Sequence, residues 1–80
     1  MNIDVARHMV RQSFRVAREL QDVLALLKES CSADEYRQHA TDIAGAIDAV
    51  STALLNRAIK VHPELKREID HQIEARGRYL

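Results

Sequence analysis

The histidines, the acidic residues near them and the single cysteine are the side chains best suited to chemistry. Glu68 and His71 have the Glu-x-x-His spacing of dimetal helical bundles, in which both side chains face the bundle interior. Leu65, Ile69 and Ile73 mark the apolar side of the same segment, and His71 points more than about 100° away from that side. One such motif is also only half of a dimetal site. The sequence therefore predicts no metal and no cofactor.

The other histidines have simple structural interpretations. Asp4 and His8 are four residues apart, as are Glu35 and His39, and such pairs are typical of hydrogen bonds on a helix surface. His62 stands immediately before a proline and is expected to cap a helix. None of these positions predicts a catalytic acid or base.

Cys31 is the only cysteine, which excludes an internal disulfide and fits a reducing compartment. It falls at a helix start, a position typical of reactive thiols, but Glu29, Asp34 and Glu35 close by disfavour a thiolate. A hydrophobic staple between Cys31 and Tyr36 is the favoured interpretation. With no glycine-rich phosphate loop either, the sequence predicts that the protein is not an enzyme.

Four arginines form a row on one face of the first predicted helix: Arg7, Arg11, Arg15 and Arg18. Arginines in such a row can bind phosphates, so a nucleic-acid-associated regulator is the alternative function. The whole chain carries 12 basic and 12 acidic residues, and 4% of its residues are aromatic. Nucleic-acid-binding domains are usually basic and offer aromatic platforms, so a solvent-facing row is the favoured interpretation.

Apolar residues recur at helical intervals of three and four, which predicts an all-α chain of three helices. We expect helices over about 3–29, 33–61 and 63–77. The expected seam residues are, in order of the helices, Ala6, Met9, Ser13, Val16, Leu20, Val23 and Leu27; Tyr36, Ala40, Ile43, Ile47, Val50, Leu54, Ala58 and Val61; and Leu65, Ile69, Ile73, Arg76 and Leu80.

Helix ends carry recognisable signals. Asn2 or Asp4 is expected to cap the first helix, and Ser32 with Glu35 forms a capping box for the second. Pro63 suits the first turn of the third helix, and Gly77 is its expected stop. The two long helices should form an antiparallel hairpin, with the third turning back at the proline; a kinked continuation of the second helix is the alternative.

Eighty residues are close to the lower limit for a self-sufficient core, so we expect the hairpin to pair into a helical bundle. The third helix reaches only about halfway along the hairpin, which leaves an apolar surface near the loop without cover. Its residues are Leu20, Val23, Leu24, Leu26, Leu27, Tyr36 and Ile43. The back of the second helix, with Gly45, Ala49 and Ala53, is a second candidate surface unless the third helix alone covers it.

Charge is unevenly distributed along the chain. Residues 1–18 carry a net charge of +3, residues 19–56 of −5 and residues 57–80 of +2. The apolar surfaces and this polarity predict a protein–protein interaction module: an adaptor, chaperone-like or regulatory subunit. Its expected partners are a second copy, forming a dimer, or another helical protein, with no membrane segment. The N-terminus lacks the unbroken apolar run of a signal peptide, so the expected location is cytoplasmic.

Overall fold

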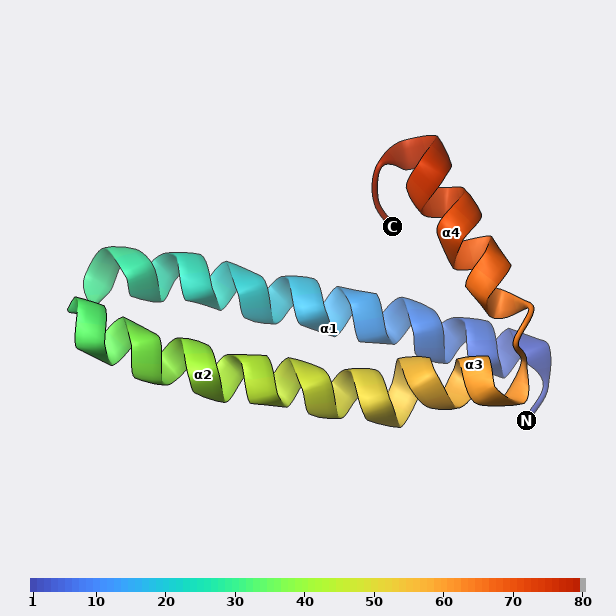
Figure 1. Ribbon diagram of the computed structural model, residues 1–80, viewed down its shortest axis with the longest axis horizontal. Helices are drawn as coiled ribbons and strands as arrows, with labels where there is room; N and C mark the ends of the chain where they lie inside the picture. Colours follow the sequence, from blue (N-terminus) through green and yellow to red (C-terminus); the bar gives the residue numbers. More distant parts are fainter. Residues whose placement is uncertain (80) are drawn as a thin grey trace.

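The chain folds as a long helical hairpin followed by a short third helix, as predicted (Figure 1). The structure is a computed structural model and describes residues 1–79. Its elements are α1 (Ile3–Ser30), α2 (Ala33–Val50), the π-helical segment η1 (Ser51–Asn56), α3 (Arg57–Val61) and α4 (Leu65–Arg76). We call the end with the N-terminus, α3 and α4 the base, and the end with the α1–α2 turn the tip. At the base the chain turns back into α4 and does not continue the line of α3.

The predicted caps are confirmed at three helix ends. The Asn2 side-chain oxygen accepts a hydrogen bond of 2.9 Å from the Val5 N–H, so Asn2 and not Asp4 caps α1. Gly77 ends α4 in the left-handed conformation, with φ of 75°, and its N–H donates to the Ile73 carbonyl. A residue with a side chain would be strained at that φ, which is why glycine is suited to this position.

The tip is closed by the capping box. The Ser32 hydroxyl accepts from the Glu35 N–H at 3.2 Å, and the Ser32 N–H donates to the Glu35 carboxylate at 3.1 Å. The hydrogen bond from the Ser32 backbone N–H is the main cause that lowers the pKa of Glu35, and the hydrogen bond with the Ser32 side chain lowers it further. Cys31 and Tyr36 are both half-buried and line one hollow beside the turn, where the staple is expected. Two residues therefore suffice to reverse the chain.

The second arm of the hairpin, which we call the returning arm, consists of α2, η1 and α3 and is not a uniform α-helix. The sequence pattern did not predict this interruption. The π-helical segment η1 has wider turns than an α-helix, so the residues after it are rotated relative to a continuous α-helix. Leu55 and Ile59 pack against the core beside Ala58, which stays in the seam and is fully buried. Val61, expected in the seam, is instead 51% exposed.

A similar drift moves the seam of α1. Val23 was expected to face α2 but is 42% exposed, while its neighbour Leu24 is half-buried. A straight helix with 3.6 residues per turn drifts about 20° per heptad from a repeat of 3.5. Over the two heptads from Met9 to Val23 the drift reaches about 40°, which turns Val23 away from α2, while Leu24 lies on the side nearer to it.

Two expectations for the third helix are wrong. The His62 side chain does not cap it, because its ring contacts Met1 and Glu64, and α4 begins after a tight turn in which the Leu65 N–H donates to the His62 carbonyl. Ile73 and Arg76 were expected to face inward, but Ile73 is 39% exposed and Arg76 is exposed as well, because α4 leans away from the hairpin (Figure 1). Leu80, expected on the same side, lies outside the described residues.

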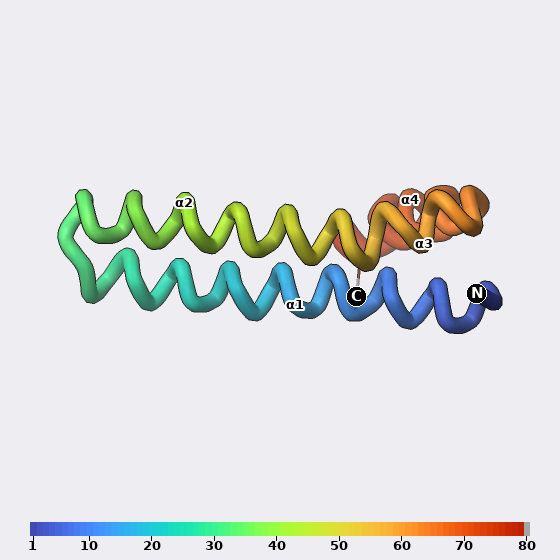
Figure 2. Tube along the Cα trace, turned by 90° about the horizontal axis from the view of Figure 1, so that it is seen from below, coloured from blue at the N-terminus to red at the C-terminus, as the bar shows by residue number. Residues whose placement is uncertain are grey.

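The molecule is elongated. Its principal dimensions are 44 × 25 × 13 Å, and its radius of gyration is 14.8 Å. A compact domain of this length has a radius of gyration of about 12 Å. Figure 2 shows the reason: the two arms of the hairpin run side by side over their full length, while α4 accompanies only the base. The tip half is thus a layer of two helices.

Candidate interaction surface

The buried core lies entirely at the base. Its apolar members are Ala6, Val10, Ala58, Leu65, Ile69 and Tyr79, and Ser13 is buried with them at 2% exposure. Leu65 and Val10 have the largest fully buried side chains. Small residues at the seam, Ala6 and Ala58, let α1 and α3 approach closely beneath α4. The base therefore contains a small core formed by three helices.

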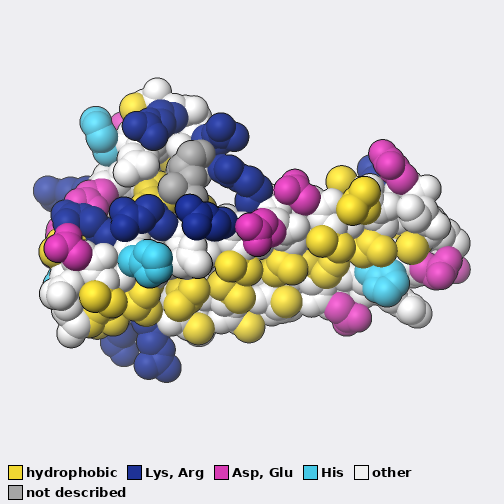
Figure 3. All heavy atoms as spheres, turned by 180° about the vertical axis from the view of Figure 1, so that it is seen from behind, with side chains coloured by type: hydrophobic (Ala, Val, Ile, Leu, Met, Phe, Trp, Pro, Cys, Tyr) yellow, Lys and Arg dark blue, Asp and Glu magenta, His cyan; other side chains and the backbone are white. Residues whose placement is uncertain are grey.

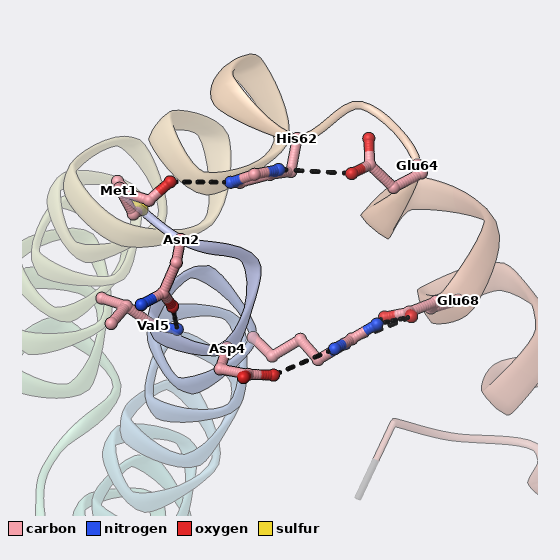
Figure 4. A network of polar contacts seen from close by, with 8 residues as sticks. Met1, Asn2, Asp4, Val5, His62, Glu64 and Glu68 are labelled. Carbon is pink, nitrogen blue, oxygen red and sulfur yellow. Dashed lines mark hydrogen bonds and ion pairs between the residues drawn. The ribbon is translucent and has the colours of Figure 1, made fainter.

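An ion pair attaches α4 to α1 at the base. Arg7 donates from Nη2 to Glu68 Oε1 at 2.7 Å and from Nε to Glu68 Oε2 at 3.1 Å, and from Nη1 to Asp4 at 3.1 Å. Figure 4 shows Asp4 and Glu68 on opposite sides of this guanidinium. The hydrogen bond from Arg7 lowers the pKa of the Glu68 carboxyl. Glu68, half of the candidate metal motif, thus attaches α4 to α1 through Arg7, while His71 is exposed.

His62 makes a second link at the corner of the base (Figure 4). Its Nε2 lies 2.9 Å from the Met1 carbonyl oxygen, and its Nδ1 lies 3.2 Å from Glu64 Oε1. A carbonyl and a carboxylate can only accept, so a ring with one N–H satisfies one of them and a ring with two satisfies both. The residue that the sequence predicted as a cap instead ties the start of α1 to the turn before α4.

Tyr79 is the core residue that sequence reasoning missed. Beyond Gly77 the chain folds back, and the Tyr79 ring packs on Phe14 with centroids 4.6 Å apart and an interplanar angle of 42°. Arg18 Nη2 lies 3.4 Å from the Tyr79 carbonyl oxygen, to which it donates. Burial raises the pKa of the Tyr79 hydroxyl. The left-handed glycine two residues earlier was the available signal, because it reverses the chain towards α1.

The tip half contrasts with the base, because no side chain from Phe14 to Arg57, all within the described residues, is buried. Leu20, Leu24, Leu27, Tyr36 and Ile43 are half-buried between the two arms. Val23 is exposed, and Leu26, at 65%, is the most exposed of the large apolar side chains described. The residues of the predicted surface therefore lie at the end of the hairpin that α4 does not reach.

One face of α1 carries an apolar stripe along its whole length. We define the apolar stripe as Val5, Met9, Val16, Leu20, Val23 and Leu27, which recur at intervals of three, four or seven and are all exposed or half-buried. Arg7, Phe14 and Arg18 face α4, and Val16 lies about 200° around the helix from Phe14. The stripe therefore faces away from α4.

Figure 3 shows this face of the molecule. Hydrophobic side chains form a nearly continuous band over the hairpin from base to tip, with most basic side chains above and below it at the base, beside a few acidic ones, and with acidic side chains around the tip. The band is wider than the stripe because side chains of the returning arm border it. Monomeric soluble proteins of this size rarely expose a contiguous apolar band that runs the length of the molecule.

The small-residue back of the second helix is open, so α4 does not cover it. Gly45, Ala49, Thr52 and Ala53 are exposed, and a methyl group added at Gly45 would meet no neighbour within 4 Å. Asp48 and Arg57 line the same shallow hollow as Ala49 and Ala53. This face, unlike the apolar stripe, is bordered by charged side chains.

The arginine row is divided between two environments. Arg7 is engaged by Glu68 and Asp4, and Arg18 by the Tyr79 carbonyl, so both help to hold α4 and the chain after it. Arg11 and Arg15 are exposed. The row that suggested phosphate binding thus has a structural role in at least two of its four members.

Residues 1–79 hold neither a cluster of metal ligands nor a membrane-spanning helix. No three His, Cys, Asp or Glu side chains of this part lie together as metal ligands would. No helix of this part combines the length and apolar character that a membrane span requires.

Comparison of the chain with protein-family models, with curated proteins and with solved structures finds no match.

Proposed function

We propose that the protein is a helical protein–protein interaction module, of the adaptor, chaperone-like or regulatory-subunit kind, that buries its apolar stripe against another helical chain. Self-association into a helical bundle is the form of this activity that requires no other component. The observation that carries the proposal is the apolar stripe, which faces away from α4 and runs from the core at the base to the uncovered tip.

The accessible surface supports the proposal quantitatively. The chain exposes 5822 Å², whereas a folded monomer of 9.1 kDa exposes about 4,900 Å². The excess of roughly 900 Å² is close to the ~800 Å² that each partner buries in a standard protein–protein interface. Helical hairpins with one apolar face commonly reach a compact state by pairing into four-helix bundles.

The test compares two glutamate substitutions on the same turn of α1. Val23→Glu places a charge on the stripe, and Ala25→Glu places the same charge at an exposed position about 160° around the helix. We expect Val23→Glu to weaken self-association at least about tenfold, which corresponds to 1.4 kcal/mol, and Ala25→Glu to leave it near the wild-type value. Light scattering measures the mass, and circular dichroism confirms that both variants remain helical. Equal behaviour of the two variants would contradict the proposal.

A further inference from the structure

The two ends of the hairpin carry opposite charge. The arms of the tip half and middle, residues 19–56, have a net charge of −5, while the base combines +3 from residues 1–18 with +2 from residues 57–80. The hairpin brings both positive segments to one end, so the long axis of 44 Å is also an electrostatic axis. Figure 3 shows basic side chains concentrated at the base and acidic side chains at the tip of the face that carries the apolar stripe.

This polarity distinguishes two ways of pairing identical hairpins. A parallel pair would place −5 beside −5 and +5 beside +5, and like charges across an interface oppose association. An antiparallel pair places each acidic tip beside the partner's basic base. A two-fold axis crossing the middle of the hairpin generates this arrangement, and the same face of both copies then forms the interface.

The position of α4 is compatible with the antiparallel pair. Arg7 contacts α4 and Phe14 contacts Tyr79 on the side of α1 opposite the apolar stripe. The third helix therefore does not obstruct the stripe. Because the stripe begins at Val5 and ends at Leu27, it is centred on Val16, the midpoint of α1. Two stripes can therefore overlap along their full length when the two-fold axis passes close to Val16.

We infer that the occupant of the apolar stripe is a second copy of this chain, packed antiparallel with its α1 across the α1 of the first. This inference rests on the proposed function and adds the identity and orientation of the partner. The tip of each copy, which has no third helix of its own, then lies beside the base of the other. The uncovered halves are covered by the assembly, and the charges of the two ends are matched.

The single cysteine tests the orientation directly, because Cys31 lies at the tip. In an antiparallel pair the two Cys31 residues lie at opposite ends, separated by a distance close to the 44 Å length of the molecule. In a parallel pair they are neighbours. We expect spin labels on Cys31 to report the long distance, and a short thiol cross-linker to join few wild-type chains.

A second variant gives the converse signal. Val16→Cys combined with Cys31→Ser moves the thiol to the expected two-fold axis, where the same cross-linker should convert most chains to covalent dimers. Raising the salt concentration should weaken the wild-type dimer several-fold, because screening removes attraction between the ends. In a parallel dimer salt would strengthen association instead.

The possible failures are distinguishable. A dimer that cross-links efficiently through Cys31 and strengthens with salt would overturn the antiparallel inference and leave the interaction module intact. A dimer that cross-links at neither position would show that another face is buried and would overturn the inference as well. A wild-type chain that stays monomeric at all concentrations would overturn both the second copy as occupant and the self-association on which the proposed function is tested.

Discussion

The base and the tip of the hairpin are built from similar helices but reach different degrees of burial. At the base, α4 and Tyr79 lie over the two arms, and Val10 and Leu65 are fully enclosed. At the tip the same two arms lie alone, and leucines that are just as apolar remain half-buried or exposed. Two amphipathic helices cannot cover each other's apolar faces, because each buries only the strip that faces its neighbour. In this chain, side chains become fully buried only where a third element packs on the two arms.

Core truncation at the base should give the largest effect on stability. Leu65→Ala removes a fully buried side chain and should lower the free energy of unfolding by about 3 kcal/mol. Leu24→Ala removes a half-buried one at the tip and should cost about 1 kcal/mol in the dilute monomer. Urea denaturation of both variants measures the difference. Equal losses would mean that the tip is as well packed as the base.

Hydrogen exchange should show the same contrast without substitution. In dilute solution, amides of α1 near Leu20–Leu27 should exchange faster than those near Ala6–Ser13, because fewer buried contacts oppose local opening. Raising the protein concentration should slow exchange at the tip far more than at the base, since assembly covers the tip. Uniform exchange that is independent of concentration would remove the distinction between the two regions.

Loss of the capping box should produce a moderate effect confined to the tip. Ser32→Ala deletes the hydroxyl that accepts from the Glu35 N–H and should cost about 1 kcal/mol. Ser51→Ala is a matched control, because Ser51 lies within the returning arm where no side-chain cap is needed. Denaturation should show a loss for the first variant that clearly exceeds the loss for the second; a larger loss for Ser51→Ala would refute the role of the cap.

Lowering the pH should slightly destabilise both the base and the tip, because each contains a carboxylate whose pKa is lowered in the folded state. The pKa of Glu68 is lowered by its hydrogen bond with Arg7, and that of Glu35 by the Ser32 backbone. A lowered folded-state pKa adds stability above the ordinary carboxyl value of 4.5, and that stability is lost as the pH falls through the lowered value.

Two amide variants separate the contributions. Glu68→Gln should flatten the acid dependence of unfolding that belongs to the base, and Glu35→Gln that of the tip, in denaturation curves recorded from neutral pH downwards. The effects should be small because both carboxylates are accessible to solvent. An acid dependence that is unchanged in both variants would show that neither interaction contributes.

Local signals in the sequence were sufficient for the hairpin and the helix ends. The residues involved, Asn2, Ser32, Glu35 and Gly77, act on neighbours within four positions, so their types and spacing carry the information. The apolar surface near the tip was also predictable, because a third helix of about 14 residues cannot reach it.

The features that were missed depend on accumulated geometry or on distant contacts. The π-helical turn at η1 and the drift of α1 moved Val61 and Val23 out of the seam, and neither shift has a signal in residue type alone. The Arg7–Glu68 pair and the Phe14–Tyr79 contact join positions more than sixty residues apart. Their partners could be found only after the position of α4 was known.

Sedimentation equilibrium of the unmodified chain, from about 1 µM to about 1 mM, most directly tests whether the exposed apolar face requires a second polypeptide. A mass rising towards twice 9.1 kDa, with a dissociation constant inside or below that range, is the expected result. A mass that stays at 9.1 kDa throughout would contradict it and would show that two helices and a short third are stable with this face in water.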